Sequence, residues 1–161
     1  MRGEGPRLRL AVQYAVRDRN GLPERAQLRR WALAALTRDA EVTLRFVEED
    51  EGRQLNRDYR GKDYATNVLT FAYGPSSSHA SPLALHPSPP LCGDIVLCAP
   101  VIAREAKAQA KPLADHCAHL LVHGLLHLQG HDHEREEEAV AMQAVESFIL
   151  RRLGVPDPYP P

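Results

Sequence analysis

One short segment, residues 123–133, restricts the fold of this chain more than any other feature of its sequence. It carries His123, His127 and His133 at the spacing H-x3-H-x5-H, with Gly130 between the second and third histidines. Positions i and i+4 lie on the same face of a helix, so the first two histidines can bind one ion together. Gly130 can adopt the left-handed conformation that ends a helix, after which the chain can turn and bring His133 to the same ion. The spacing therefore predicts a helix, a turn and a metal site with three histidine ligands.

The predicted metal site has an open coordination position. Three neutral imidazoles leave one position of a tetrahedral zinc ion for water, which is typical of catalytic rather than structural sites. We expect one zinc ion per chain, although nickel or another divalent transition metal can occupy the same ligands. The segment approaches the long zincin motif H-E-x-x-H-x-x-G-x-x-H, but Gly124 stands where zincins carry a glutamate. Since that glutamate is the general base of metalloproteases, the sequence argues against ordinary peptide hydrolysis by that route.

Length and composition indicate a single catalytic domain over residues 1–161. A hydrophobic fraction of 43% and a charged fraction of 25% are typical of a globular domain with one core. No apolar run approaches the roughly 18 residues of a membrane span, and the N-terminus lacks the apolar core of a signal peptide, so we expect a cytoplasmic protein. The three cysteines form no C-x-x-C pair and are expected to be small buried residues.

Hydrophobic periodicity predicts an α+β fold in which about five helices pack on a four-stranded mixed sheet. The expected strands are 8–14, 42–47, 66–71 and 93–98, and the expected helices are 23–36, 50–59, 100–110, 112–128 and 134–153. The apolar stripe of the last helix is expected to consist of Val140, Ala144, Val145, Phe148 and Ile149. Residues 74–90 are rich in proline and serine and predict a long loop, and residues 156–161 predict an extended, disordered tail.

Three blocks of the sequence resemble the YbeY endoribonucleases, the bacterial rRNA maturation factors. The histidine segment is similar to the family's H-G-x-L-H-L-x-G-[YH]-D-H. Residues 55–71 resemble L-N-x-x-Y-R-G-x-D-x-x-T-[DN]-V-L-S-F, with Thr70 in place of the usual serine, and residues 91–96 resemble L-G-D-I-V. The resemblance extends from about Val42 to Leu150 and includes the zincin-like three-histidine metal site.

The resemblance implies a function. It implies a single-strand-specific, metal-dependent endoribonuclease in small-subunit rRNA maturation and ribosome quality control. The implied partners are single-stranded RNA, small-subunit rRNA and ribosomal components, with neither DNA nor a membrane among them. A basic segment that contains Arg53, Arg57, Arg60 and Lys62 is consistent with a phosphate-bearing substrate, although the net charge of −1 alone indicates no such partner.

The resemblance also implies roles for residues in the basic segment. Arg60 corresponds to the arginine of the family's Y-R-G block, where a guanidinium can grip two phosphate oxygens and offset the charge that builds on the reacting phosphorus. We therefore predict that Arg60 is catalytic; the alternative is an ion pair with Asp58 or Asp63. Arg57 and Lys62 are predicted phosphate contacts in substrate binding, and solvent-exposed surface positions are the alternative for both.

Other polar residues accompany the histidine ligands. Asp132 can either orient a ligand imidazole or cap the helix that follows. His131 can exchange protons near neutral pH, or can serve in packing and hydrogen bonding. His119 and His116 lie one and two turns, respectively, before the first predicted ligand and are expected to be structural.

Two other functions stay open. One is a metal-dependent hydrolase of another substrate, a peptide or a small ester, which the glycine at position 124 disfavours in its peptide form. The other is a non-catalytic ribosome assembly factor with a structural metal. Removal of the metal from a folded protein would separate an enzyme from such a factor.

Overall fold

The computed structural model describes residues 5–73, 90–131 and 135–159. The expected proline- and serine-rich loop lies outside these residues, apart from Pro90, and so do Asp132 and His133. No helix in the described ranges has both the length and the apolar character needed to cross a membrane.

A four-stranded mixed sheet forms the centre of the molecule. Its strands are β1 (Leu8–Ala15), β2 (Ala40–Val47), β3 (Val68–Tyr73) and β4 (Leu91–Cys98), in the order β1-β2-β4-β3. The first three in this order are parallel, and β3 runs antiparallel to β4 at the edge. The second half of β4 is apolar without alternation because helices cover both of its faces there. The predicted α+β class with a mixed sheet is confirmed.

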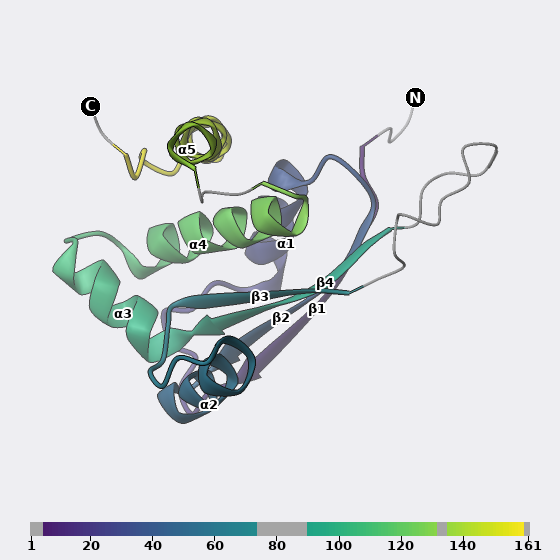
Figure 1. The fold of residues 1–161 in the computed structure, drawn as a ribbon. Helices are drawn as coiled ribbons and strands as arrows, with labels where there is room; N and C mark the ends of the chain where they lie inside the picture. The colour runs from purple at the N-terminus through teal and green to yellow at the C-terminus, as the bar shows by residue number, and fades with distance from the viewer. Residues whose placement is uncertain (1–4, 74–89, 132–134, 160–161) are drawn as a thin grey trace.

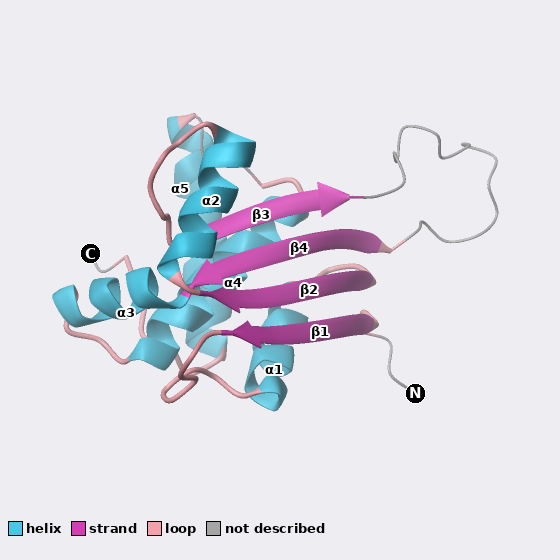
Figure 2. Ribbon diagram, turned by 90° about the horizontal axis from the view of Figure 1, so that it is seen from below, coloured by secondary structure: helices cyan, strands magenta, loops and turns pink. Residues whose placement is uncertain are grey.

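Five helices surround the sheet (Figure 1). They are α1 (Arg25–Ala35), α2 (Glu49–Arg60), α3 (Ala99–Ala108), α4 (Leu113–Leu128) and α5 (Glu136–Arg152). Helices α1 and α4 cover one face, and α5 packs on the outer side of α4 as a further layer. On the other face α2 covers only part of the strands, and Figure 2 shows the remainder of that face open.

Helix α4 lies unusually close to the sheet because of a glycine. A Cβ atom at Gly124 would lie 3.2 Å from Cγ2 of Thr70 on β3 and 3.3 Å from Cδ1 of Ile95 on β4. The helix ends at Leu128, and Gly130, two residues later, has a left-handed φ of 99°, as predicted. The amide of Gly130 donates to the carbonyl oxygen of His127, and the next amide donates to that of Leu126, which is the Schellman pattern.

The predicted stripe of α5 is wrong at three positions, because Val140, Ala144 and Phe148 are all exposed. Val140 and Phe148 are 60% and 54% exposed, whereas Ile149 is buried as expected. The helix turns Met142, Glu146, Ser147, Ile149 and Leu150 inward instead. The buried face of α5 includes a glutamate and a serine, so a pattern of apolar residues alone does not identify it.

The prediction of a disordered tail is wrong for residues 156–159. Val155 is buried, and the hydroxyl of Ser147 donates to Oδ1 of Asp157 at 2.7 Å. The hydroxyl of Tyr159 donates to Oε1 of Glu146 at 2.6 Å. Proline favours extended backbone, but the side chains between the prolines fix this segment on α5. Residues 160–161 lie outside the described residues.

Candidate metal centre

Two of the three predicted ligands converge on one point. His123 and His127 lie on the same face of α4, and their Nε2 atoms are 3.1 Å apart with the rings nearly perpendicular. Two nitrogens that each lie about 2.0–2.1 Å from a tetrahedral zinc ion are roughly 3.3 Å from one another. The pair therefore fits two ligands of a single ion without a change of rotamer.

The third predicted ligand, His133, falls in the short gap between the described ranges, together with Asp132. Within residues 5–73, 90–131 and 135–159, no group of three potential metal ligands is assembled. His131 is exposed at the end of α4, and its backbone amide completes the helix cap.

A buried carboxylate supports His123, the first of the predicted ligands. Glu146 of α5 has no exposed surface, and it accepts hydrogen bonds from Nδ1 of His123, Nε2 of His119 and the hydroxyl of Tyr159. Burial alone would raise the pKa of Glu146, but the three hydrogen bonds outweigh burial and lower the pKa to about 2. The carboxylate is therefore ionised at neutral pH. With Nδ1–H of His123 donating to it, Nε2 of the same ring carries the lone pair that a metal requires.

The C-terminal segment fixes this carboxylate in turn. Burial, and then the neighbouring Glu146, raise the pKa of Tyr159, so its hydroxyl remains a donor. His119 donates to the same oxygen at 3.2 Å and packs edge-on against the tyrosine ring. The sequence reasoning missed Glu146 and Tyr159. The spacing of Met142, Glu146 and Ile149 on one helical face was the available signal for the first, and nothing comparable existed for the second.

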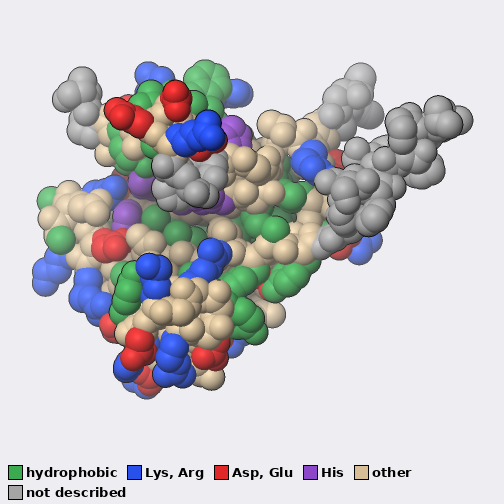
Figure 3. Space-filling view, viewed as in Figure 1, with side chains coloured by type: hydrophobic (Ala, Val, Ile, Leu, Met, Phe, Trp, Pro, Cys, Tyr) green, Lys and Arg blue, Asp and Glu red, His purple; other side chains and the backbone are tan. Residues whose placement is uncertain are grey.

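Arg60 faces the same cavity as the two histidines. The cavity has a volume of about 430 Å³, and its lining includes Arg60, Lys62, Thr70, His123 and His127. In Figure 3 histidine side chains are visible in the hollow between the lobe of α2 and the layer of α5. Nη2 of Arg60 donates to the carbonyl oxygen of Thr70 at 2.8 Å. The structure thus joins the basic segment to the histidine helix.

The two aspartates considered as alternative partners of Arg60 pair with other arginines instead. Asp63 pairs with Arg53 at 2.8 Å, and Asp58 lies 3.5 Å from Arg57. Arg57 is also 3.9 Å from Asp63, and it does not line the histidine cavity. Of the two predicted phosphate contacts, the structure places Lys62 beside the histidines and Arg57 outside their cavity.

The remaining histidines of α4 have structural surroundings, as predicted. His116 is buried, and its Nε2 lies 2.8 Å from Oε1 of Glu105 on α3. Burial lowers the pKa of His116, and the hydrogen bond with Glu105 opposes this effect only in part. Cys117 is fully buried next to it, and burial raises the pKa of its thiol to about 12, which favours the neutral form.

The fold and the cavity define an α+β protein with a histidine-based candidate metal centre beside an arginine. Comparisons with known proteins identify the group to which it belongs. A family model described as Endoribonuclease YbeY matches residues 22–154. The chain is 56% identical to the Endoribonuclease YbeY of Nitrosospira multiformis over 155 residues, which covers 95% of this chain and 82% of that protein. It is 55% identical to the Endoribonuclease YbeY of Methylobacillus flagellatus, with 96% and 95% covered.

The chain belongs to the YbeY family. A solved structure shows the same fold at low sequence similarity. It is the solution structure of TM1509 from Thermotoga maritima, with a TM-score of 0.54 and 21% identity over 90% of this chain and 91% of that one.

Proposed function

We propose that this protein is a zinc-dependent, single-strand-specific endoribonuclease that acts in the cytoplasm in small-subunit rRNA maturation and ribosome quality control, together with ribosomal components. The observation that carries the proposal is the convergence of the Nε2 atoms of His123 and His127 in the cavity that Arg60 also lines. The names of the relatives, which are endoribonucleases, support the same activity.

The residues present fit a metal ion. His123, His127 and His133 would hold it, and Glu146 keeps the first of these in the tautomer that can coordinate. When bound, zinc supplies Lewis acidity and lowers the pKa of a coordinated water to about 7. No glutamate is needed next to His123 for this chemistry, so Gly124 is compatible with it.

Arg60 binds and orients the reacting phosphate. The carbonyl oxygen of Thr70 accepts from one guanidinium nitrogen, and a guanidinium carries five N–H groups, so a forked pair of donors can still face the phosphate oxygens. Its charge opposes the negative charge that develops during phosphoryl transfer. Lys62 would contact a neighbouring phosphate within the cavity, and Arg57 would contact the strand beyond it. Asp132 would orient a ligand imidazole, with His131 beside it.

The test combines metal content with cleavage. Protein prepared without a histidine tag should contain one zinc ion per chain by elemental analysis. His127→Ala should fall well below stoichiometric zinc and lose cleavage of single-stranded RNA. His116→Gln, a matched control on the same helix, should retain zinc.

Chelation should abolish cleavage by the wild-type protein, and added zinc should restore it while circular dichroism shows the same helix content throughout. Near-full zinc retention by His127→Ala would reject the ligand set. Undiminished cleavage by folded, metal-free protein would reject the metal-dependent reaction.

A further inference from the structure

A second cavity adjoins the histidine cavity on the other side of the edge strand β3. Its volume is about 640 Å³, and it shares Arg60 and Thr70 with the histidine cavity. Side chains alternate along β3, so Thr70 faces α4 and Phe71 faces α2. A single-stranded RNA that extends from the histidine cavity past Arg60 would therefore enter this second cavity next.

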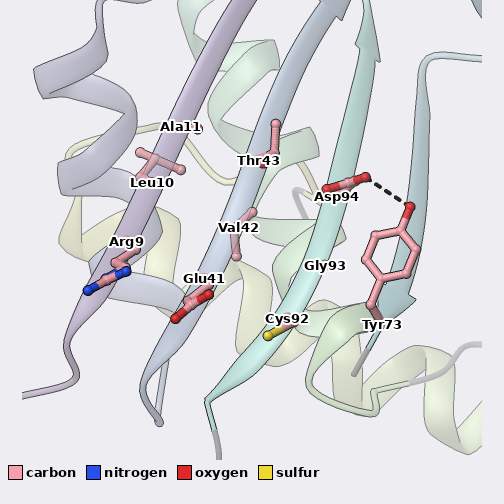
Figure 4. Close-up of a pocket in the computed structure, with 10 residues that line it drawn as sticks. All are labelled: Arg9, Leu10, Ala11, Glu41, Val42, Thr43, Tyr73, Cys92, Gly93 and Asp94. Atoms are coloured by element: carbon pink, nitrogen blue, oxygen red, sulfur yellow. Dashed lines mark hydrogen bonds between the residues drawn. The ribbon is translucent and has the colours of Figure 1, made fainter. Parts of the chain in front are cut away.

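The path continues onto the open face of the sheet. There a shallow pocket, drawn in Figure 4, shares Tyr73 and Asp94 with the second cavity. The close-up shows the ring of Tyr73 beside β4, with its hydroxyl directed at the carboxylate of Asp94. Three hollows thus form a continuous surface that begins at the histidines.

Aromatic and aliphatic side chains form the walls of the second cavity. Leu55 and Tyr59 come from α2, and Phe71 and Val96 come from the sheet. Tyr59 is 67% exposed, and its ring contacts the ring of Phe71 edge-on at a centroid distance of 5.4 Å. Tyr73, at the rim, is 57% exposed. An isolated exposed tyrosine is ordinary, but two at the same cavity above a phenylalanine form a platform for flat rings.

Of the four charged side chains at this cavity in the described part of the chain, Arg45 and Glu51 form an ion pair, and Asp94 accepts a hydrogen bond from a tyrosine hydroxyl. Arg45 donates two hydrogen bonds to Glu51, at 2.7 and 3.0 Å, and Asp94 accepts from Tyr73 at 2.9 Å. Arg60 stands between the two cavities, with its guanidinium carbon 6.0 Å from the centre of the Phe71 ring. The second cavity therefore suits an uncharged planar group, whereas the histidine cavity, with Arg60 and Lys62, suits a phosphate.

We propose that the second cavity is a nucleobase subsite, in which the base adjacent to the phosphate held by Arg60 stacks on the exposed ring of Tyr59, next to Phe71. This inference rests on the proposed RNA-cleaving function. A nucleotide joins a phosphate to a flat ring system, which is the pair of groups that the two cavities accept. Stacking tolerates every base because each has a π face, so the subsite selects unpaired strands without selecting a sequence.

The test measures binding separately from cleavage. A labelled single-stranded RNA with 2′-O-methyl riboses and phosphorothioate linkages is titrated with zinc-loaded protein, and Kd is read from fluorescence anisotropy. Tyr59→Ala should raise Kd on the order of tenfold. Tyr59→Phe, which keeps the ring, should bind as the wild type does. Phe148→Ala removes a 54% exposed ring from α5, outside the three hollows, and should leave Kd unchanged.

An abasic scan of the same RNA identifies the base concerned. Removal of one base should weaken wild-type binding by a similar factor and should add little in Tyr59→Ala, because both changes remove the same contact. Unchanged Kd in Tyr59→Ala, or fully additive losses, would overturn the subsite. Cleavage of unmodified RNA is measured in parallel and reports on the proposed function. If the protein cleaves RNA but Tyr59→Ala leaves Kd unchanged or the losses are additive, the nuclease function is retained and the subsite is rejected.

Discussion

At the scale of single residues, Arg60 owes its position to a backbone group. An exposed arginine has a flexible side chain, and ordering it for a substrate costs conformational entropy. The hydrogen bond to the carbonyl oxygen of Thr70 holds the guanidinium at the cavity before any substrate arrives. Edge strand β3 can provide this acceptor because, among the described residues, no strand pairs with it on one side.

Arg60→Ala should slow RNA cleavage about a hundredfold, or about 3 kcal/mol, because it removes positive charge at the reacting phosphate. Arg60→Lys should recover only part of the rate, because an ammonium cannot make the forked contact. Single-turnover cleavage, zinc content and melting temperature are measured on one preparation. Arg104→Ala, which removes an exposed arginine paired with Glu49 on another surface, is the control. Normal cleavage by Arg60→Ala with zinc bound would place the residue outside the active site.

Glu146→Gln should weaken zinc binding by about 10–100-fold, because a neutral amide does not hold the His123 ring as the carboxylate does. Competition against a chromophoric chelator gives the affinity. Glu105→Gln is the matched control, since it changes the same kind of histidine–carboxylate pair at His116, away from the metal. Tyr159→Phe keeps the carboxylate and should cause a smaller loss. Equal zinc affinity in Glu146→Gln and wild type would assign the carboxylate a purely structural role.

At the scale of elements, helices α3 and α4 meet through a buried histidine that disfavours protonation. Nε2 of His116 is paired with Glu105, and its Nδ1 is buried with no hydrogen-bond partner among the described residues. A proton added at Nδ1 would create a buried N–H without an acceptor, which is consistent with the lowered pKa.

The contact between α3 and α4 should therefore weaken in mild acid. Because the pKa of His116 in the folded protein lies below its unfolded value of about 6.5, the associated stability is present above that pH and is lost as the pH falls below it. The urea midpoint of metal-free protein, compared at about pH 7.5 and pH 5.5, should fall further for the wild type than for His116→Gln. Parallel changes in the two proteins would mean that His116 does not contribute.

Local signals made the histidine helix predictable, because apolar spacing, the ligand pair and Gly130 all indicate the same element. Helix α5 was predictable as a helix but not in its rotation about the axis. Its buried face includes Glu146, and sequence periodicity counts a glutamate as exposed. The packed segment at residues 156–159 was not predictable either, because its order depends on contacts with α5 rather than on its own composition.

The same distinction holds within the candidate site. The proximity of His123 and His127 follows from helical spacing alone, and their shared cavity with Arg60 follows only from folding. The sequence offered Asp58 and Asp63 as neighbours for this arginine, but its partner is the backbone carbonyl oxygen of Thr70 on β3, the next element along the chain. Every residue carries a backbone carbonyl, so the sequence of side chains does not indicate which carbonyl will accept a hydrogen bond.

At the scale of the whole molecule, the site lies around an edge of the sheet rather than in a closed pocket. The histidine cavity faces α4, the second cavity faces α2, and Arg60 joins them across β3. A substrate that contacts both cavities has to bend around a strand. A single RNA strand can do so, whereas a duplex has a stiff backbone and bases that are already stacked and paired.

Single-stranded RNA should therefore be cleaved faster than the same sequence annealed to its complement. Both substrates are compared under single-turnover conditions with zinc-loaded protein. Chelated protein serves as the check for contaminating nucleases. Equal rates on the two forms would contradict the edge-wrapping arrangement.

The tight seam between α4 and the sheet also has an evolutionary consequence. The glutamate that gives zincins their peptidase activity would have to occupy position 124, where even a methyl group would press on Thr70 and Ile95. A single codon change would insert a buried, uncompensated carboxylate and destabilise the fold. Glutamate at position 124 would therefore require Thr70 and Ile95 to shift, so this route to peptidase chemistry carries a stability cost in this scaffold.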